Sequence, residues 1–349
     1  MNKLKFFLSV VSVLFFSLNA SAQNVYNKDE LNCNDSGKYC TTKEGTPVTG
    51  IVKAYDENGK LQTDSNYVNG EKTGLEKNYY PSGELLSETN YENGEISGIA
   101  KIYCECGKLQ SETNYVNGKI SFEKKYYLSG KLRSEVNYAD GEMNGIAKSY
   151  YEGGELLSDV NYVNGNMNGI SKFYYESGKL QAEANYVNGH VNGTAKFYYD
   201  NGELQSETNY VNGKISLEKK YYPSGKLQSE INYADDVMNG LEKNYYENGK
   251  LQSETNYVNG NMNGISKFYY ESGKLQAEEN YINNQIDGIA KSYYENGKLK
   301  SATIYADGKK NGVAKWFAED GKLEREINYV NDEEASTGDA GKTLPKNNP

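Results

Sequence analysis

Short runs of apolar and β-branched residues recur along the chain and alternate with glycine-containing turns. Each run has about seven residues rich in Tyr, Ile, Phe and Thr, and successive runs are separated by Glu-Asn-Gly, Glu-Ser-Gly, Pro-Ser-Gly or Asp-Asn-Gly. Asn-Gly between two such runs is a strong hairpin signal, because a type I′ turn needs positive φ at both central residues. The pattern therefore predicts a chain of β-hairpins.

These hairpins are copies of one another, because twelve glycines recur at spacings of 24 or 23 residues. We call them the turn glycines and count repeat positions from them. They are Gly59, Gly83, Gly107, Gly130, Gly154, Gly178, Gly202, Gly225, Gly249, Gly273, Gly297 and Gly321. A unit this short cannot bury a hydrophobic face alone, so neighbouring copies must stack.

The charges predict the register of each hairpin. Lysine occupies position minus six in all twelve copies, and position plus five is Asp or Glu in eleven. A two-residue turn at Asn58-Gly59 and its equivalents places these positions opposite each other, where cross-strand ion pairs favour one register. The expected pairs include Lys77 with Glu88, Lys172 with Glu183 and Lys267 with Glu278. A three-residue turn with a bulge is less favoured, because it would misplace the lysines.

Tyrosine is an architectural residue, since 32 of the 34 tyrosines occupy three repeat positions. These are minus four (the first tyrosine), minus three (the second) and plus eight (the third). In the two-residue register the second tyrosine faces the leucine at plus two, and the third shares that face. We expect this Tyr-Leu-Tyr stripe to be the interaction surface, and the opposite face to be wetter. Its representative residues are Tyr80, Leu85, Tyr91, Tyr175, Leu180, Tyr186, Tyr270, Leu275 and Tyr281.

The predicted fold is all-β, an elongated single-layer antiparallel meander of about twelve stacked β-hairpin repeats. The predicted segments are a signal peptide (1–22), an N-terminal segment or cap (23–45), the repeats (46–331) and a disordered polar tail (332–349). In the last copy Trp316 and Phe317 replace the usual residues. We expect them to form a C-terminal cap over the final edge strand, because exposed edges invite aggregation.

The N-terminus has the features of a secretory signal peptide. Two lysines precede an apolar run, which ends in small residues. Cleavage is expected between Ala22 and Gln23. The alternative is a membrane anchor, but about 13 apolar-rich residues fall short of the roughly 20 that a spanning helix needs. The chain is therefore expected to be exported, as a secreted, periplasmic or cell-surface protein with no membrane span.

Export permits disulfides, and the four cysteines are candidates for them. Cys33 and Cys40 lie before the repeats, where a short closed loop could anchor an N-terminal cap, whereas Cys104 and Cys106 lie in one repeat. A structural metal site needs about four suitable ligands, and the only histidine, His190, lies in a variable link. We expect no metal and no cofactor.

The charge balance and the missing motifs restrict the function. The formal charge is -10, and removing the two leader lysines gives -10 - 2 = -12. Such a chain does not favour nucleic acid, whose binding depends on basic patches. No nucleophile with an adjacent base and no phosphate-binding loop is apparent, so we expect no enzyme. The expected partner is an unidentified protein, with self-association as a further possibility.

The unit G-x-x-K-x-Y-Y-x-x-G-K-L-x-x-E-x-x-Y-x-x-G resembles the MORN-repeat variant of bacterial proteins, which is commonly classed with YwqK-family antitoxins of toxin-antitoxin systems. The resemblance covers about Thr46 to Val330 and implies a β-hairpin array used in protein contacts. Two functions follow as expectations. One is an exported scaffold that mediates protein-protein contacts, at the cell surface or with proteins of a host or a neighbouring cell. The other is an antitoxin or immunity protein that neutralises a cognate toxin.

Overall fold

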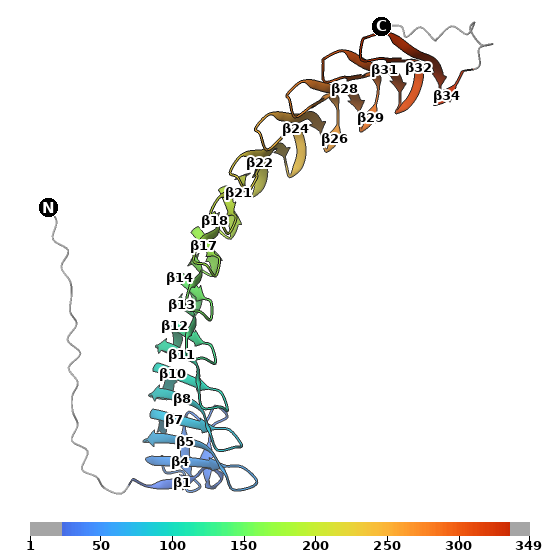
Figure 1. The fold of residues 1–349 in the computed structure, drawn as a ribbon. Helices are drawn as coiled ribbons and strands as arrows, with labels where there is room; N and C mark the ends of the chain where they lie inside the picture. Colours follow the sequence, from blue (N-terminus) through green and yellow to red (C-terminus); the bar gives the residue numbers. More distant parts are fainter. Residues whose placement is uncertain (1–22, 336–349) are drawn as a thin grey trace, which may run out of the picture. The chain divides into compact units, whose positions relative to one another are not determined.

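The structure, a computed structural model, describes residues 23–335. The predicted leader, including Ala22, and residues 336–349 of the predicted tail lie outside this range. The chain divides into two compact units, residues 1–130 and 131–349, and each is built almost wholly of β-strands (Figure 1). The predicted all-β fold of repeated hairpins is confirmed within each unit.

The first unit is an antiparallel meander extended at its beginning by a parallel strand. Its first elements are β1 (Val25–Asn27), the 3₁₀ helix η1 (Lys28–Glu30), β2 (Leu31–Cys33) and β3 (Cys40–Thr42). The meander contains β4 (Gly50–Tyr55), β5 (Leu61–Val68), β6 (Glu71–Lys72), β7 (Gly74–Tyr79), β8 (Leu85–Glu92), β9 (Glu95–Ile96), β10 (Gly98–Tyr103), β11 (Leu109–Val116) and β12 (Lys119–Tyr126). Strand β1 pairs in parallel with β4, whereas β2 and β3 form a separate hairpin.

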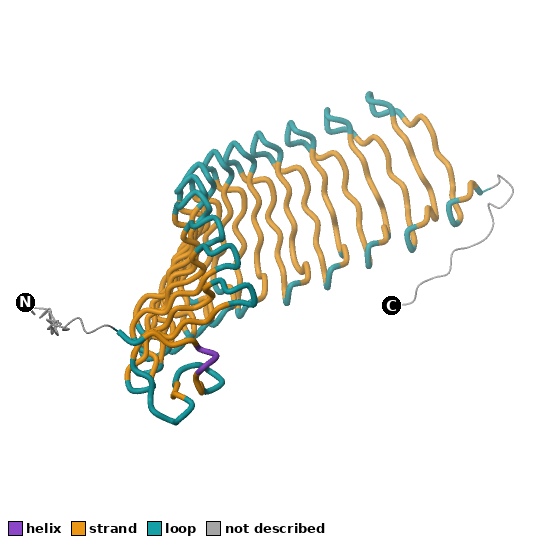
Figure 2. Tube along the Cα trace, turned by 90° about the horizontal axis from the view of Figure 1, so that it is seen from below, coloured by secondary structure: helices purple, strands orange, loops and turns teal. Residues whose placement is uncertain are grey.

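The second unit continues the same repeat, and its turns line the two ends of the strands (Figure 2). Its elements are β13 (Leu132–Ala139), β14 (Glu142–Tyr150), β15 (Leu156–Val163), β16 (Asn166–Met167), β17 (Gly169–Tyr174), β18 (Leu180–Val187), β19 (His190–Val191), β20 (Gly193–Tyr198), β21 (Leu204–Val211), β22 (Lys214–Tyr221), β23 (Leu227–Ala234), β24 (Val237–Tyr245), β25 (Leu251–Val258), β26 (Asn261–Met262), β27 (Gly264–Tyr269), β28 (Leu275–Ile282), β29 (Gln285–Ile286), β30 (Gly288–Tyr293), β31 (Leu299–Ala306), β32 (Lys309–Phe317), β33 (Leu323–Val330) and β34 (Glu333–Glu334). Strand β34 belongs to the last link, so the repeat pattern extends past residue 331 into the segment predicted as tail.

The type I′ turn lies in the links between hairpins and not at the turn glycines. At the first link, Asn69 and Gly70 have φ of 50° and 85°, and Val68 pairs with Glu71 across them. Positive φ at both central residues is the mark of this turn. The other links carry Asn or Asp at the first position, and these residues tolerate the left-handed region better than other side chains.

The turn glycines lie in a three-residue turn with a bulge, which corrects the predicted two-residue turn. Gly59 has φ of 75° and donates its N–H to the Asp56 carbonyl, whereas the Asn58 backbone is not left-handed. This is a type I turn followed by glycine in the left-handed region. Tyr55 then pairs with Leu61, and the register shifts between Ala54 and Tyr55. That second irregularity compensates for the first, so the lysine register is as predicted.

Residues that face each other across a pair of strands share a face of the sheet, and alternate residues along a strand occupy opposite faces. Two faces follow from the observed register. The charged face carries positions minus eight, minus six, minus four, plus five, plus seven and plus nine. The tyrosine face carries positions minus seven, minus five, plus four, plus six and plus eight. On the tyrosine face, small residues such as Ser171, Ala195 and Ser266 are almost fully buried.

Candidate functional site

The predicted Tyr-Leu-Tyr stripe is mainly internal packing. All nine of its representative residues are half-buried, and the leucine faces the first tyrosine instead of the second, as in the pair Tyr79 and Leu85. The three-residue turn produces this difference, because it shifts the pairing beside the turn by one residue. Tyr80 instead begins the turn, where its carbonyl accepts the N–H of Gly83. The stripe therefore offers little free surface for a partner.

The second tyrosine connects each copy to the next. The Tyr80 hydroxyl donates to the backbone carbonyl of Tyr103 at 2.8 Å, and the Tyr175 hydroxyl donates to that of Tyr198 at 2.6 Å. The same bond recurs from Tyr151, Tyr199, Tyr222, Tyr246, Tyr270 and Tyr294. In the first copy Asp56 stands at this position, and its carboxylate accepts the N–H groups of Asn58 and Lys60 within the turn. These contacts are architectural.

The lysines and carboxylates form a charge row along each unit. Lys77 faces Glu88 in its own hairpin and Asp64 in the preceding one, with its Nζ 3.7 Å from a Glu88 oxygen. Lys172 faces Glu183, and Lys267 faces Glu278, as predicted. The Lys267 Nζ nevertheless lies 3.6 Å from Glu254 of the preceding hairpin. Most lysines thus have a carboxylate on both sides, a feature that pairing within single hairpins did not predict.

First tyrosines bind the same carboxylates. The Tyr150 hydroxyl donates to Glu135 at 2.8 Å, and the Tyr221 hydroxyl donates to Glu207 at 3.0 Å. Burial and these hydrogen bonds to carboxylates raise the pKa of each of the two tyrosines to about 12. A neutral phenol donating to a carboxylate is therefore the stable state at ordinary pH. These groups set the architecture and do not form an acid-base pair.

An aliphatic band on the charged face is the most exposed apolar surface, and it was not predicted. Position minus eight is apolar in eleven of twelve copies, and so is position plus nine. The exposed members at minus eight include Ile146 (47%), Ile170 (62%), Ile265 (56%) and Ile289 (52%). Exposed members at plus nine are Val68, Val116, Val163, Val187, Val211, Val258, Ile282 and Val330. We call these two positions together the aliphatic band.

The band is one surface within each unit because its two positions adjoin. Ile170 faces Asn185, and Val187 lies two residues further along the same strand, β18. Contiguous exposed apolar groups of this kind mark interaction sites. The sequence could have indicated this band, because positions minus eight and minus six are two residues apart on one strand and therefore share a face. The expectation that this face is the wetter one concealed it.

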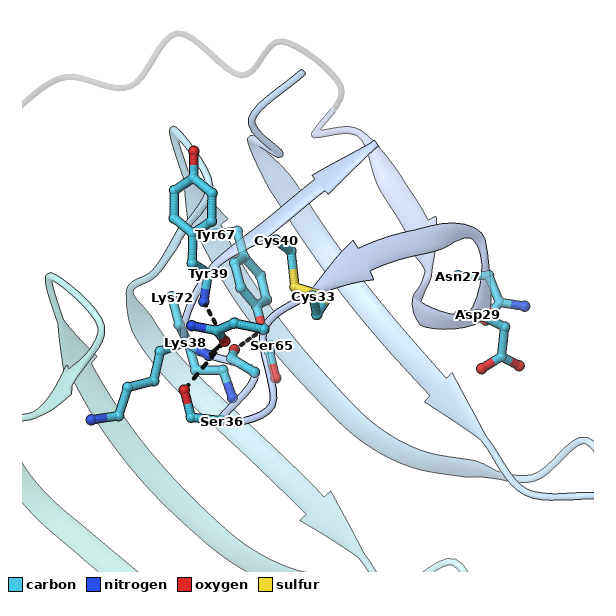
Figure 3. The surroundings of a disulfide bond; sticks show 12 residues. Asn27, Asp29, Cys33, Ser36, Lys38, Tyr39, Cys40, Ser65, Tyr67 and Lys72 are labelled. Atoms are coloured by element: carbon cyan, nitrogen blue, oxygen red, sulfur yellow. Dashed lines mark hydrogen bonds between the residues drawn. A yellow bond between two sulfur atoms is a disulfide. The ribbon is translucent and has the colours of Figure 1, made fainter. Parts of the chain in front are cut away.

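A second candidate site lies under the N-terminal segment of the first unit. The Lys72 Nζ is 2.5 Å from a Glu76 oxygen, and both residues are buried. The Ser65 hydroxyl also donates to Glu76, at 2.6 Å. Burial alone would raise the pKa of Glu76, but hydrogen bonds from Lys72 and Ser65 and the lysine charge hold it below its usual value. Figure 3 shows Lys72, Ser65 and Tyr67 beside the Cys33–Cys40 disulfide.

The N-terminal segment packs on this ion pair and encloses a small polar pocket. The Tyr67 hydroxyl donates to the Gly37 carbonyl at 2.5 Å, and the Lys72 ammonium lies 4.8 Å from the centre of the Tyr91 ring. The pocket has a volume of about 230 Å³ and includes Asn34, Asp35 and Ser36 in its lining. Lys72 and Glu76 bond each other, and Ser65 and Tyr91 also donate to Glu76, so the arrangement is that of a cap.

Cysteines, the histidine and the last copy add little to these two candidates. The structure joins Cys33 to Cys40 and Cys104 to Cys106. His190 lies at the start of β19 and is exposed. Trp316 lies on β32, the first strand of the last hairpin. The guanidinium carbon of Arg325, on β33, lies 5.6 Å from the centre of the Trp316 ring.

Neither a metal cluster nor a spanning helix is found where the structure describes the chain. Within residues 23–335, no three His, Cys, Asp or Glu side chains are grouped so that they could hold a metal ion. No helix among these residues is long and apolar enough to cross a membrane.

One protein family matches most of the chain. The model of the family described as MORN repeat variant matches residues 48–69, 72–93, 123–140, 143–164, 167–188, 191–212, 216–235, 238–259, 262–283, 286–307 and 310–331. The copy that it leaves out contains Cys104 and Cys106, yet β10 and β11 form the same hairpin there as elsewhere. No curated protein matches the chain.

Similarity to solved structures is low in both sequence identity and TM-score. A GtfA/B complex bound to UDP and GlcNAc is 17% identical, with a TM-score of 0.16, and the match covers 32% of this chain and 23% of that one. TcdB2-TccC3 is 15% identical, with a TM-score of 0.18, and the match covers 84% of this chain and 19% of that one. The chain thus spans about a fifth of the length of these proteins. Such low scores carry no argument about function.

Proposed function

Because this chain belongs to the family of MORN repeat variants, we propose that it is an exported repeat scaffold that binds a protein partner through the aliphatic band. The exposure of that band is the observation that supports the proposal. Ile170, at 62% exposure, is more exposed than the other large apolar residues on its face. An array of near-identical copies presents the same contact many times, and linked contacts give avidity beyond a single site.

Other features of the chain agree with a binding role. The half-buried tyrosines are engaged between copies, and the charge row is balanced, so neither offers a strong attraction for nucleic acid or for an anionic lipid surface. The charge of the exported chain is about -12, and it is spread over many copies. We propose no enzymatic activity, because the recurrent polar groups are satisfied within the sheet.

A capture experiment tests the binding role. The chain from Gln23 onward is used as bait against extracellular proteins, beside a variant with Ile170→Thr, Ile265→Thr and Ile289→Thr. Threonine already occupies this position as Thr194, so the substitutions suit the fold. Phe197→Ser on the tyrosine face is the matched control, since serine occupies the same position in other copies. The proposal is supported if the wild type and the Phe197→Ser variant capture a partner that the triple variant does not. If the triple variant captures the same partner equally well, the aliphatic band is not the binding surface.

Export is proposed separately and tested by fractionation. The leader composition supports it, and the expected product begins at Gln23 and lies outside the cytoplasm. Detection of the chain only in the cytoplasm, with its leader uncut, would contradict export and leave the binding role standing.

An antitoxin or immunity protein is the second candidate. The acidic charge favours it if the toxin is basic, because opposite charges speed association. Co-expression of the chain from Gln23 onward with a toxin encoded beside it should then rescue growth. The triple band variant serves as a control for the binding surface.

A further inference from the structure

The aliphatic band of the second unit has a regular spacing. Ile170 and Ile265 face Asn185 and Asn280 in their hairpins, so an exposed isoleucine is followed on the next strand by an asparagine. The exception is Ile289, which faces Ile304. Neighbouring strands are about 4.8 Å apart, which places successive aliphatic ridges about 9.6 Å apart with a polar gap between them. A partner that covers several copies needs apolar groups with the same spacing.

The asparagines keep those gaps open because their side chains are engaged in the sheet. The Asn161 amide donates to the Asn168 carbonyl at 2.7 Å, and the Asn256 amide donates to the Asn263 carbonyl at 2.9 Å. Each amide is thereby held against the link and does not cover its aliphatic neighbours. The surface is a series of ridges and shallow gaps, into which ridges of equal spacing fit.

The charge row beside the band has a related property. Along the second unit, Lys172, Lys196 and Lys243 each face a carboxylate in their own hairpin and another in the preceding one. The charge thus alternates from strand to strand and sums to nearly zero. A strongly acidic or basic partner would leave half of the row facing like charges. A second row of the same kind, displaced by one strand, places every lysine over a carboxylate.

We propose that the charged face of the second unit docks a second copy of this chain, face to face. A two-fold axis parallel to the strands places band on band and charge row on charge row, with the two arrays antiparallel. The isoleucine ridges of one copy then occupy the asparagine gaps of the other. Two sheets packed in this way bury their facing side chains as a sandwich does, and the interface is isologous. This inference rests on the proposed role of the band as a protein-binding surface.

Sedimentation velocity and light scattering of the chain from Gln23 onward test the inference. The wild type should form a dimer with a dissociation constant of about 1 µM or below, the range of a specific interface. Ile170→Thr, Ile265→Thr and Ile289→Thr together should raise this constant by about 100-fold or more, because the loss of apolar burial occurs in both copies. Phe197→Ser on the opposite face should leave it unchanged. Circular dichroism should show the same fold in all three proteins.

The outcomes separate this inference from the proposed function. A wild-type chain that stays monomeric at concentrations on the order of 100 µM overturns the second copy as occupant. If that monomer still captures another protein through the band, the scaffold role stands without the dimer. A dimer that resists the triple variant but is lost with Phe197→Ser places the interface on the tyrosine face and also overturns the inference. A dimer that depends on the band, formed by a chain that captures no other protein, supports the dimer inference but not the scaffold role.

Discussion

Position minus seven shows at the level of a single residue how the repeat accommodates burial. Ser171 and Ser266 are 0% and 1% exposed, and their hydroxyls have no hydrogen-bond partner. Alanine occupies the same position in five copies, among them Ala195 and Ala314. A buried hydroxyl without a partner destabilises the folded state. These two serines therefore weaken the sheet where they stand.

Ser171→Ala together with Ser266→Ala should raise the free energy of unfolding by about 1 kcal/mol per site or slightly more, since each removes an unsatisfied buried group. The measurement is the urea midpoint of the chain. Ala195→Ser, the reverse change at the equivalent position, is the control and should lower the midpoint. A double alanine variant less stable than the wild type would show that these hydroxyls have partners in solution.

The ion pair of Lys72 and Glu76 occupies two positions that vary among the copies. Methionine stands at the lysine position in Met143 and Met167, and alanine stands at the glutamate position in Ala100. Lys72→Met alone leaves the Glu76 charge buried and unpaired, which should cost about 3 kcal/mol or more. Adding Glu76→Ala removes that charge and should restore most of the stability. The thermal midpoint of the two variants measures the difference.

The same pair predicts a dependence on pH. The folded pKa of Glu76 lies below its ordinary value of 4.5, so its contribution is present above that value and is lost as the pH falls through the folded pKa. Wild type should therefore lose stability in acid faster than the double variant. Equal acid profiles would show that the pair contributes nothing to the cap.

Residue patterns predicted the lysine register correctly, because Lys77 and Glu88 recur as a charge match that few registers satisfy. They did not predict the buried pair, since Lys72 lies in a link where a polar residue suggests exposure. Burial there comes from the N-terminal segment, which has no repeat pattern to place it. The hairpin of β2 and β3 over Tyr67 is visible only in three dimensions.

Among the elements, the type I′ turn was predicted at the turn glycines, but it lies in the links. Both turns contain Asn-Gly in many copies, so the dipeptide alone does not distinguish them. The difference lies in the residues around it. The link turn connects Val68 directly to Glu71 as the ladder requires, whereas the hairpin turn also carries the bulge beside Tyr55. The stripe was misassigned for the same reason.

A pair of alanine substitutions distinguishes the turns. Asn212, in a link, has φ of 53°, and alanine there should cost about 1–2 kcal/mol because of the left-handed backbone. Ser224 precedes the turn glycine Gly225 and is not left-handed, so Ser224→Ala should change stability by less than about 0.5 kcal/mol. The midpoint of chemical unfolding reports both. Asn212→Gly, which suits positive φ, should be nearly neutral, and equal losses at both turns would contradict the assignment.

Over the whole molecule, the tyrosines couple stability to alkaline pH. Burial and nearby carboxylates raise the pKa of Tyr91, Tyr150, Tyr221 and Tyr257 to about 12. A folded pKa above the ordinary value of 10 means that the stabilising contribution is complete below pH 10 and is lost as the pH rises towards 12. The tyrosinate absorbance that these four phenols contribute should therefore rise together with the loss of the circular dichroism signal, above pH 10. A variant with Tyr91, Tyr150, Tyr221 and Tyr257 changed to Phe should lack this high-pH absorbance step, and an unchanged step would contradict the buried phenol-carboxylate contacts.

The repetition of the chain made its fold class readable from sequence, whereas its binding surface was harder to place. Because the unit recurs twelve times, the hairpin pattern, the lysine at minus six and the leucine at plus two stand out from the variable positions. The aliphatic band required knowing which positions stay uncovered once the tyrosines have packed. Ile170 and Tyr175 are both large, yet Ile170 is exposed, whereas the Tyr175 hydroxyl is engaged with the next copy.

The hydroxyl-to-carbonyl bond of the second tyrosine has a genetic consequence. Each bond reaches only the following copy, as from Tyr175 to Tyr198, and no copy depends on one further away for it. Segments that repeat the same amino-acid sequence, such as the two copies of ISKFYYESGKLQAE, are encoded by similar stretches of a gene, which invite unequal recombination. A gene of this kind can lengthen or shorten its product by whole units without a compensating mutation. Relatives should therefore differ in copy number more readily than in the residues of a single copy.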